Sequence, residues 1–266
     1  MDYLRFIFYG IIQGFTEFIP VSSTAHLKIL SLLFGINDPG SSFSAIIQIG
    51  SVFAIFWYFR KTIFNYKKIN SNEIYQLILS NKLFKSIFIG TIPIICIGGF
   101  IKLFVPSFSD SFLRSNFSIA IVSLLISLIM FLADNSASKF INLGNYNYSN
   151  SVFIGIAQAF AVIPGVSRSG ATISMALLLG WERKDAAKFS FLLGIPAISL
   201  AALVEFFSVI NKFSTFPFLP LLVGLIATFL SSLLAIDFLI KFLSSNGLKI
   251  FIYYRLVFAI LILLNL

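Results

Sequence analysis

The sequence predicts an all-α, polytopic membrane protein with about six transmembrane helices plus two re-entrant helical hairpins in inverted repeats. Three observations lead to this prediction. Of the 266 residues, 58% are hydrophobic and only 11% are charged, whereas about a quarter of the residues of a soluble domain are charged. Several apolar runs have about 20 residues, the length that crosses the hydrocarbon core of a bilayer. Finally, one apolar segment studded with polar residues occurs twice.

The repeat pairs residues 10–24, GIIQGFTEFIPVSST, with residues 155–169, GIAQAFAVIPGVSRS. Six of the fifteen aligned positions are identical, and the alignment keeps a Gln and a Ser in register. Composition alone would give roughly one identity. A second match follows each copy, FSAIIQIGS from Phe43 and FSFLLGIPA from Phe189. We therefore expect each repeat to contain the polar segment and the span after it.

Apolar runs of sufficient length predict six transmembrane helices. They cover residues 43–59, 84–104, 116–133, 189–208, 217–243 and 250–266. Two further apolar segments, residues 4–34 and 152–181, are interrupted by proline, serine and, in the second, glycine. Broken helices at membrane depth are tolerated only where protein or water satisfies the freed backbone groups, so we expect two helix-break-helix hairpins that face each other inside the bundle.

These elements predict one integral membrane domain, residues 1–266, with inverted repeat halves of about 1–135 and 150–266. Lysine and arginine between the spans predict the orientation. If the loop after residues 43–59 is cytoplasmic, twelve of the nineteen basic residues lie inside. They are Arg60, Lys61, Lys67, Lys68, Lys82, Lys85, Lys139, Arg183, Lys184, Lys188, Lys241 and Lys249. Both termini then lie outside and the hairpins enter from opposite sides, so that the two breaks meet near the middle of the bilayer.

The net charge of +9 comes from basic clusters between apolar runs. Such clusters orient the spans and contact anionic lipid headgroups, so membrane lipids are expected partners and nucleic acid is not. Charged residues near the span ends, Asp134 and Arg255 among them, are expected to snorkel to the interface.

The first break and the helix before it carry a carboxylic acid, an imidazole base and serine hydroxyl groups. Gln13 and Glu17 are four residues apart on one helix face, and Ser22, Ser23 and His26 follow the proline. An ionisable group inside a membrane segment is costly and by default functional, so we expect Glu17 and His26 to act at a site.

The second break combines Ser167, Arg168, Ser169, Gly170 and Thr172 at the expected start of a helix. A glycine-rich turn before a helix presents free N–H groups and partial positive charge, and an arginine fork binds phosphate through two hydrogen bonds. This half is expected to bind a phosphate or diphosphate. Together the two breaks predict a phosphoryl-transfer site built from different repeats.

The motifs QGFTEF at 13–18, PVSSTAH at 20–26 and IPGVSRSGAT at 163–172 resemble those of the bacitracin-resistance family of undecaprenyl-diphosphate phosphatases. The resemblance covers essentially the whole chain. It implies a multi-pass enzyme of the bacterial inner (plasma) membrane that hydrolyses undecaprenyl diphosphate to undecaprenyl phosphate and inorganic phosphate. This reaction recycles the lipid carrier for cell-wall synthesis, and the resemblance implies a divalent cation, Mg²⁺ or Ca²⁺, as cofactor. Carried over by motif, the functional positions are Gln13, Glu17, Ser23, His26, Ser167, Arg168 and Thr172.

The expected mechanism assigns diphosphate binding to the second break and cation binding to Glu17 and Gln13. Either Ser23, with His26 as its base, or His26 itself attacks the terminal phosphorus, and both alternatives stay open. The expected catalytic residues are Glu17, Ser23, His26 and Arg168. The expected substrate-binding residues are Ser22, Ser167, Arg168, Ser169, Gly170 and Thr172. The expected partners are the polyprenyl diphosphate substrate, membrane lipids and a second copy of the chain in a homodimer.

Structural roles are the alternative for individual residues, because Glu17 and Arg168 also suit a structural ion pair and serine often hydrogen-bonds across membrane helices. For the whole protein, the alternative is a transporter or flippase of an anionic prenyl-phosphate lipid, since inverted repeats with broken helices are typical of transporters. A flippase has little need of Ser, His and Glu beside the phosphate. The first break therefore favours an enzyme.

Overall fold

The computed structural model describes residues 2–33, 40–64, 82–105, 108, 111–136, 140–209 and 218–264. Within them the chain forms helices and no strand beyond one isolated bridge, so the all-α prediction is confirmed. The helices are α1 (Asp2–Phe18), α2 (Ser23–Leu33), α3 (Gly40–Phe64), α5 (Lys82–Phe104), α6 (Asn116–Ser136), α7 (Tyr148–Ala159), α8 (Arg168–Leu178), α9 (Arg183–Val209), α10 (Phe218–Ser245) and α11 (Lys249–Leu263), with 3-10 turns η2 (Phe112–Arg114) and η3 (Phe160–Val162).

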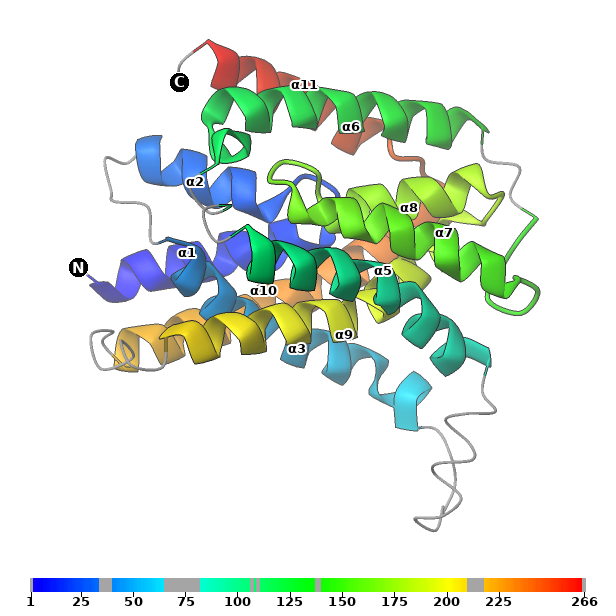
Figure 1. Cartoon of the computed structure of the whole chain (residues 1–266), viewed down its shortest axis with the longest axis horizontal. Helices are drawn as coiled ribbons and strands as arrows, with labels where there is room; N and C mark the ends of the chain where they lie inside the picture. The colour runs from blue at the N-terminus through cyan, green and yellow to red at the C-terminus, as the bar shows by residue number, and fades with distance from the viewer. Residues whose placement is uncertain are drawn as a thin grey trace.

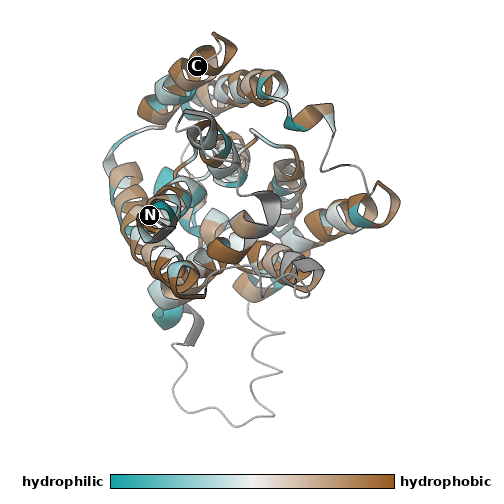
Figure 2. Ribbon diagram, turned by 90° about the vertical axis from the view of Figure 1, so that its left-hand side faces the viewer, coloured by the Kyte–Doolittle hydropathy of each residue, from teal (hydrophilic) through white to brown (hydrophobic). Residues whose placement is uncertain are grey.

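Within the described residues, four helices are long and apolar enough to cross a membrane, namely α5, α6, α9 and α10. Large apolar side chains of these helices, such as Phe88, Leu125 and Leu234, are more than half exposed, as a lipid-facing surface requires. Figure 2 shows that hydrophobic residues, in brown, predominate along the helices at the outside of the bundle. The chain is thus a multi-pass membrane protein. The two other expected spans, residues 43–59 and 250–266, fall on α3 and α11. The described part of α11 has 15 residues, fewer than the about 20 that cross a bilayer. The count of six spans therefore stays a prediction.

Both polar segments form a helix, a break and a second helix. The first break follows Phe18, where α1 ends, and the second follows Val162, where η3 ends. Each contains a proline, which lacks the N–H that would continue the helical hydrogen bonds. In Figure 1, α1 and α7 run toward the middle of the bundle from opposite ends. The two breaks are thereby brought together inside the bundle.

Matching glycines allow the first helix of each broken segment to pack closely. A Cβ on Gly10 of α1 would collide with the carbonyl of Gly224 in α10, and a Cβ on Gly155 of α7 would collide with the backbone of Gly90 in α5. Gly10 and Gly155 are aligned positions of the sequence repeat. Small residues permit such close backbone approach between membrane helices. The packing of α1 on α10 therefore corresponds to that of α7 on α5.

At one end of the bundle, Asp134 near the end of α6 links three helices. Its carboxylate accepts hydrogen bonds from Arg183 Nε at 2.6 Å and from the Leu248 N–H at 3.0 Å. The start of α9 and the turn before α11 therefore lie at the same end as the end of α6. Asp134 is only 5% exposed, so the expectation that it snorkels is wrong, because the partly buried Arg183 pairs with its carboxylate inside the bundle end. Of the basic residues expected on the cytoplasmic side, Lys67, Lys68 and Lys139 lie outside the described residues.

Candidate active site

One serine in each break has a left-handed backbone. Ser22 has φ of 75° and Ser167 has φ of 64°, and among the described residues these are the non-glycine residues with positive φ. They are aligned positions of the sequence repeat. Such a conformation costs about 1–3 kcal/mol and persists only where the surroundings enforce it. The Ser22 carbonyl accepts the N–H of His26, and the Ser167 carbonyl accepts the N–H of Ala171, so each serine directly precedes the first turn of a helix.

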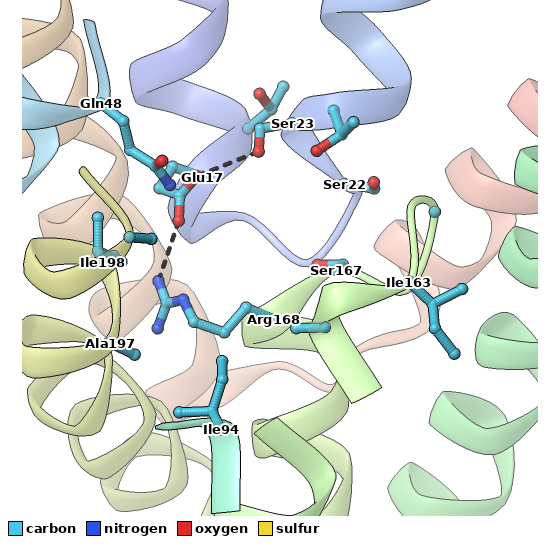
Figure 3. Close-up of a pocket in the computed structure, with 15 residues that line it drawn as sticks. Glu17, Ser22, Ser23, Gln48, Ile94, Ile163, Ser167, Arg168, Ala197 and Ile198 are labelled. Atoms are coloured by element: carbon cyan, nitrogen blue, oxygen red, sulfur yellow. Dashed lines mark hydrogen bonds and ion pairs between the residues drawn. The ribbon is translucent and has the colours of Figure 1, made fainter. Parts of the chain in front are cut away.

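The Glu17 carboxylate joins the two breaks (Figure 3). Its Oε2 accepts hydrogen bonds from Ser23 Oγ at 3.1 Å and from Gln13 Nε2 at 3.0 Å, and its Oε1 lies 3.5 Å from an NH2 of Arg168. The side chains of Glu17 and Arg168 are only 5% and 8% exposed. Ser23 and Arg168 are also aligned positions of the repeat. The first residues of α2 and α8 therefore contact one carboxylate, and the expected proximity of Glu17 and Arg168 is present.

A cavity of about 160 Å³ lies beside this carboxylate. Its polar side comes from both breaks and carries Glu17, Ser22, Ser23, Ser167 and Arg168. Its other side is apolar and includes Ile94 of α5 and Ala197 and Ile198 of α9. The cavity thus offers charged and hydroxyl groups on one side and hydrocarbon on the other.

Gln48 of α3 also lines the cavity, although the sequence reasoning did not select it. The sequence did contain an indication of Gln48, because this residue belongs to FSAIIQIGS, the second segment matched between the repeats.

Several predicted residues support the cavity and are not among its lining residues: Gln13, His26, Ser169, Gly170 and Thr172. Gln13 binds Glu17, as described above. Thr172 Oγ1 lies 2.8 Å from the Arg168 carbonyl oxygen and 2.6 Å from Ser190 Oγ. The Gly170 N–H donates to Ser167 Oγ at 3.2 Å, which caps α8. These hydrogen bonds stabilise the first turn of α8, which begins at Arg168.

His26 packs against α11. Its Nδ1 is 2.8 Å from the Ser22 carbonyl oxygen and its Nε2 is 2.6 Å from the Tyr254 hydroxyl. Because a carbonyl only accepts, Nδ1 carries the proton, and Nε2 of the neutral ring accepts from Tyr254. The ring also stacks on Phe258, with 4.2 Å between centroids. Both ring nitrogens are engaged, and Ser23 donates to Glu17, so the expected pairing of Ser23 with His26 is not formed.

Arg168 is held by α9 as well as by Glu17. Its NH1 donates to the Ser190 carbonyl at 3.1 Å. One turn further along α9, a Cβ added to Gly194 would collide with the guanidinium. The absence of a side chain at Gly194 therefore lets the Arg168 guanidinium lie directly against α9.

Arg255 of α11 contacts both breaks, a role that the sequence reasoning missed. Its side chain is completely buried and donates to the carbonyl oxygens of Pro20 and Gly165. The expected snorkelling of Arg255 is wrong, because oxygens inside the bundle accept hydrogen bonds from NH1 and NH2 of its buried guanidinium.

Comparison with known proteins gives the family. Residues 6–261 match the family model described as Bacitracin resistance protein BacA. The chain belongs to the BacA family. It is 77% identical to the undecaprenyl-diphosphatase of Prochlorococcus marinus strain MIT 9515 and 74% identical to that of P. marinus subsp. pastoris strain CCMP1986, over the whole of each chain. The undecaprenyl-diphosphatase of P. marinus strain NATL2A is 47% identical over 98% of this chain and 95% of the relative.

Replacing Gly194 with alanine in this BacA-family protein is expected to lower its catalytic activity by about tenfold or more. The added methyl group displaces the Arg168 guanidinium from its place beside Glu17, and misplacing a binding group by about 1 Å costs up to about 100-fold in rate. Gly99→Ala is the matched control, because nothing lies within 4 Å of a Cβ at Gly99. Steady-state rates of the two purified variants test this, and equal rates would contradict the role given to Gly194.

Proposed function

We propose that this chain hydrolyses undecaprenyl diphosphate to undecaprenyl phosphate and inorganic phosphate, and thereby recycles the lipid carrier for cell-wall synthesis. The observation that carries the proposal is the meeting of Glu17, Ser23 and Arg168 at one cavity. The names of the relatives at 77% and 74% identity support the same activity. We place this activity in the bacterial inner (plasma) membrane, where such a lipid carrier resides.

The second break is suited to bind the diphosphate. Arg168 offers a planar fork of donors, and the first turn of α8 contributes partial positive charge. Ser167 lines the same cavity. The apolar side, with Ile94, Ala197 and Ile198, suits the beginning of the prenyl chain, while the remainder of the chain stays in the bilayer.

The first break is suited to attack the terminal phosphorus. Ser23 Oγ already donates to Glu17 Oε2 at 3.1 Å, so the carboxylate is placed to take the hydroxyl proton as the Oγ–P bond forms. The bond from phosphorus to the bridging oxygen then breaks and undecaprenyl phosphate leaves. Water hydrolyses the phosphoserine and releases inorganic phosphate. His26 acts in this scheme as a positioning residue, because its Nδ1–H holds the Ser22 carbonyl beside Ser23.

A divalent cation, Mg²⁺ or Ca²⁺, is part of the proposal. Among the lining residues Glu17 is the single carboxylate, and the described residues contain no group of three or more His, Cys, Asp or Glu side chains that would hold a metal alone. Mg²⁺ commonly binds through one or two carboxylates together with substrate phosphates. Glu17 and the side-chain oxygen of Gln13 fit that pattern, and the bound ion would neutralise charge on the diphosphate.

The finer topology also belongs to this proposal: six spans, two re-entrant hairpins and inverted repeat halves. Three correspondences support it, namely the strained serines, the glycine contacts of α1 and α7, and the shared contacts of Ser23 and Arg168 with Glu17. A homodimer stays a prediction.

Purified protein in detergent is expected to release inorganic phosphate from undecaprenyl diphosphate. EDTA should abolish the release, and added Mg²⁺ or Ca²⁺ should restore it. Binding of the lipid by an intact, metal-supplied preparation without any phosphate release would instead favour the transporter or flippase.

Acid quenching of a single turnover is expected to trap a phosphoserine at Ser23. With substrate labelled in its terminal phosphate, the label on the protein should survive acid, because phosphate esters of serine are acid-stable while phosphohistidine is acid-labile. Ser23→Ala should carry no label, whereas Ser31→Ala, which removes a hydroxyl bonded to Tyr9, should label normally. A label that is lost in acid and retained in base would assign the attack to His26.

A further inference from the structure

Arg255 binds the same backbone position in both breaks. Its NH1 donates to the Pro20 carbonyl at 3.4 Å, and its NH2 donates to the Gly165 carbonyl at 2.8 Å. Pro20 and Gly165 are aligned positions of the sequence repeat. Each bound carbonyl lies two residues before the strained serine of its break, Ser22 or Ser167. One guanidinium therefore spans the two breaks at equivalent points.

The burial of Arg255 is unusual for a cation. The side chain is 0% exposed, and among the described residues it forms no ion pair with a carboxylate. A buried charge is retained only where hydrogen bonds compensate its lost hydration. Besides the two break carbonyls, Ser123 of α6 provides its Oγ at 3.2 Å and its carbonyl oxygen at 3.5 Å. The two breaks that carry the site thus provide two of the four acceptors of this guanidinium, including the one at the shortest distance.

The geometry of the site depends on the separation of the breaks. Glu17 precedes the first break, while Ser23 and Arg168 each come three residues after a carbonyl that Arg255 binds. If the breaks moved apart, Arg168 would lose its contact with Glu17, which is already 3.5 Å long. The strained backbone of Ser22 and Ser167 likewise needs surroundings that enforce it.

We propose that Arg255 is a positioning residue that sets the separation of the two breaks and so places Ser23 and Arg168 on Glu17. The effect on catalysis rests on the phosphatase function proposed above, whereas the effect on separation does not. A lysine cannot replace it, because a single ammonium does not offer the rigid fork that reaches both carbonyls.

The test compares Arg255→Lys and Arg255→Gln with the Ser123→Ala control, which removes one acceptor and leaves both break contacts in place. We expect kcat of the first two to fall by about 100-fold or more, as for a misplaced reacting group, with a smaller change in KM. Ser123→Ala should change kcat much less, because the contacts of Arg255 with the Pro20, Gly165 and Ser123 carbonyls are retained.

The separation is measured directly with spin labels at Thr24 and Phe160, both exposed residues next to the breaks. The background carries Cys96→Ser, because Cys96 is exposed and would react with the label. Electron–electron double resonance should give one narrow distance distribution for the parent and for Ser123→Ala. It should give a shifted or broadened distribution for Arg255→Lys and Arg255→Gln.

An unchanged distance distribution in both Arg255 variants would overturn the proposal, whether or not activity is lost. If these variants do not fold, Arg255→Gly is prepared with added guanidinium ion, which should restore both the folded protein and the parent distance. Failure to restore them would also overturn it. A parent protein that releases no phosphate would refute the proposed function, while the distance measurement would still test the spacing.

Discussion

Glu17→Gln is expected to lower kcat by about 1000-fold, within the range lost with a general base. The amide has nearly the same shape but cannot take the proton that Ser23 now donates to Oε2 at 3.1 Å. It also leaves the buried Arg168 without its negative partner. Breaking a buried pair from one side costs about 3–5 kcal/mol, so the variant should also unfold at a lower temperature.

Phosphate release and thermal unfolding in the same detergent measure both effects of Glu17→Gln. Asp237→Asn is the control, because that carboxylate is partly exposed and pairs with Lys241 on the same helix. Exposed pairs of this kind contribute about 1 kcal/mol or less. A Glu17→Gln enzyme that keeps a tenth of the parent rate would remove Glu17 from proton transfer.

Arg168→Lys is expected to reduce kcat/KM by about 100-fold or more although the charge is kept. The guanidinium contacts Glu17 with one nitrogen and the Ser190 carbonyl with another, and it offers a planar fork to the diphosphate. An ammonium is a point charge and cannot reproduce this geometry. Binding of a non-hydrolysable methylene analogue of the substrate should weaken as well.

The matched control for Arg168→Lys is Arg60→Lys. Arg60 is exposed at the end of α3 and lies over the ring of Trp57, away from the cavity. The same exchange there should leave kcat/KM and analogue binding unchanged. Near-normal activity of Arg168→Lys would exclude the bidentate binding of diphosphate from the mechanism.

The sequence was sufficient to predict an all-helical membrane protein and a site shared by two breaks, because hydropathy and the repeat report on both directly. The contact of Glu17 with Arg168 follows from placing the two breaks together. The environment of His26 does not follow, because Tyr254 and Phe258 lie in the last helix, without a motif that links them to the first break.

The role of Arg255 was hidden for a different physical reason. Two of its principal partners are the backbone carbonyls of Pro20 and Gly165, and every residue has a backbone carbonyl, so no side-chain pattern marks the interaction. Gln48, in contrast, lies in a segment that the repeat already marked, but a neutral amide in a membrane span is easily taken for a packing residue.

The equivalence of Ser23 and Arg168 bears on the history of the fold. If both halves descend from one gene that inserted in either orientation, its paired products would have presented the same residue to the centre from both sides. Fusion of the two copies would have removed that constraint, since each half would then have been free to change alone. Here a hydroxyl and a guanidinium at aligned positions of the repeat approach a single carboxylate, an arrangement that two identical halves could not provide.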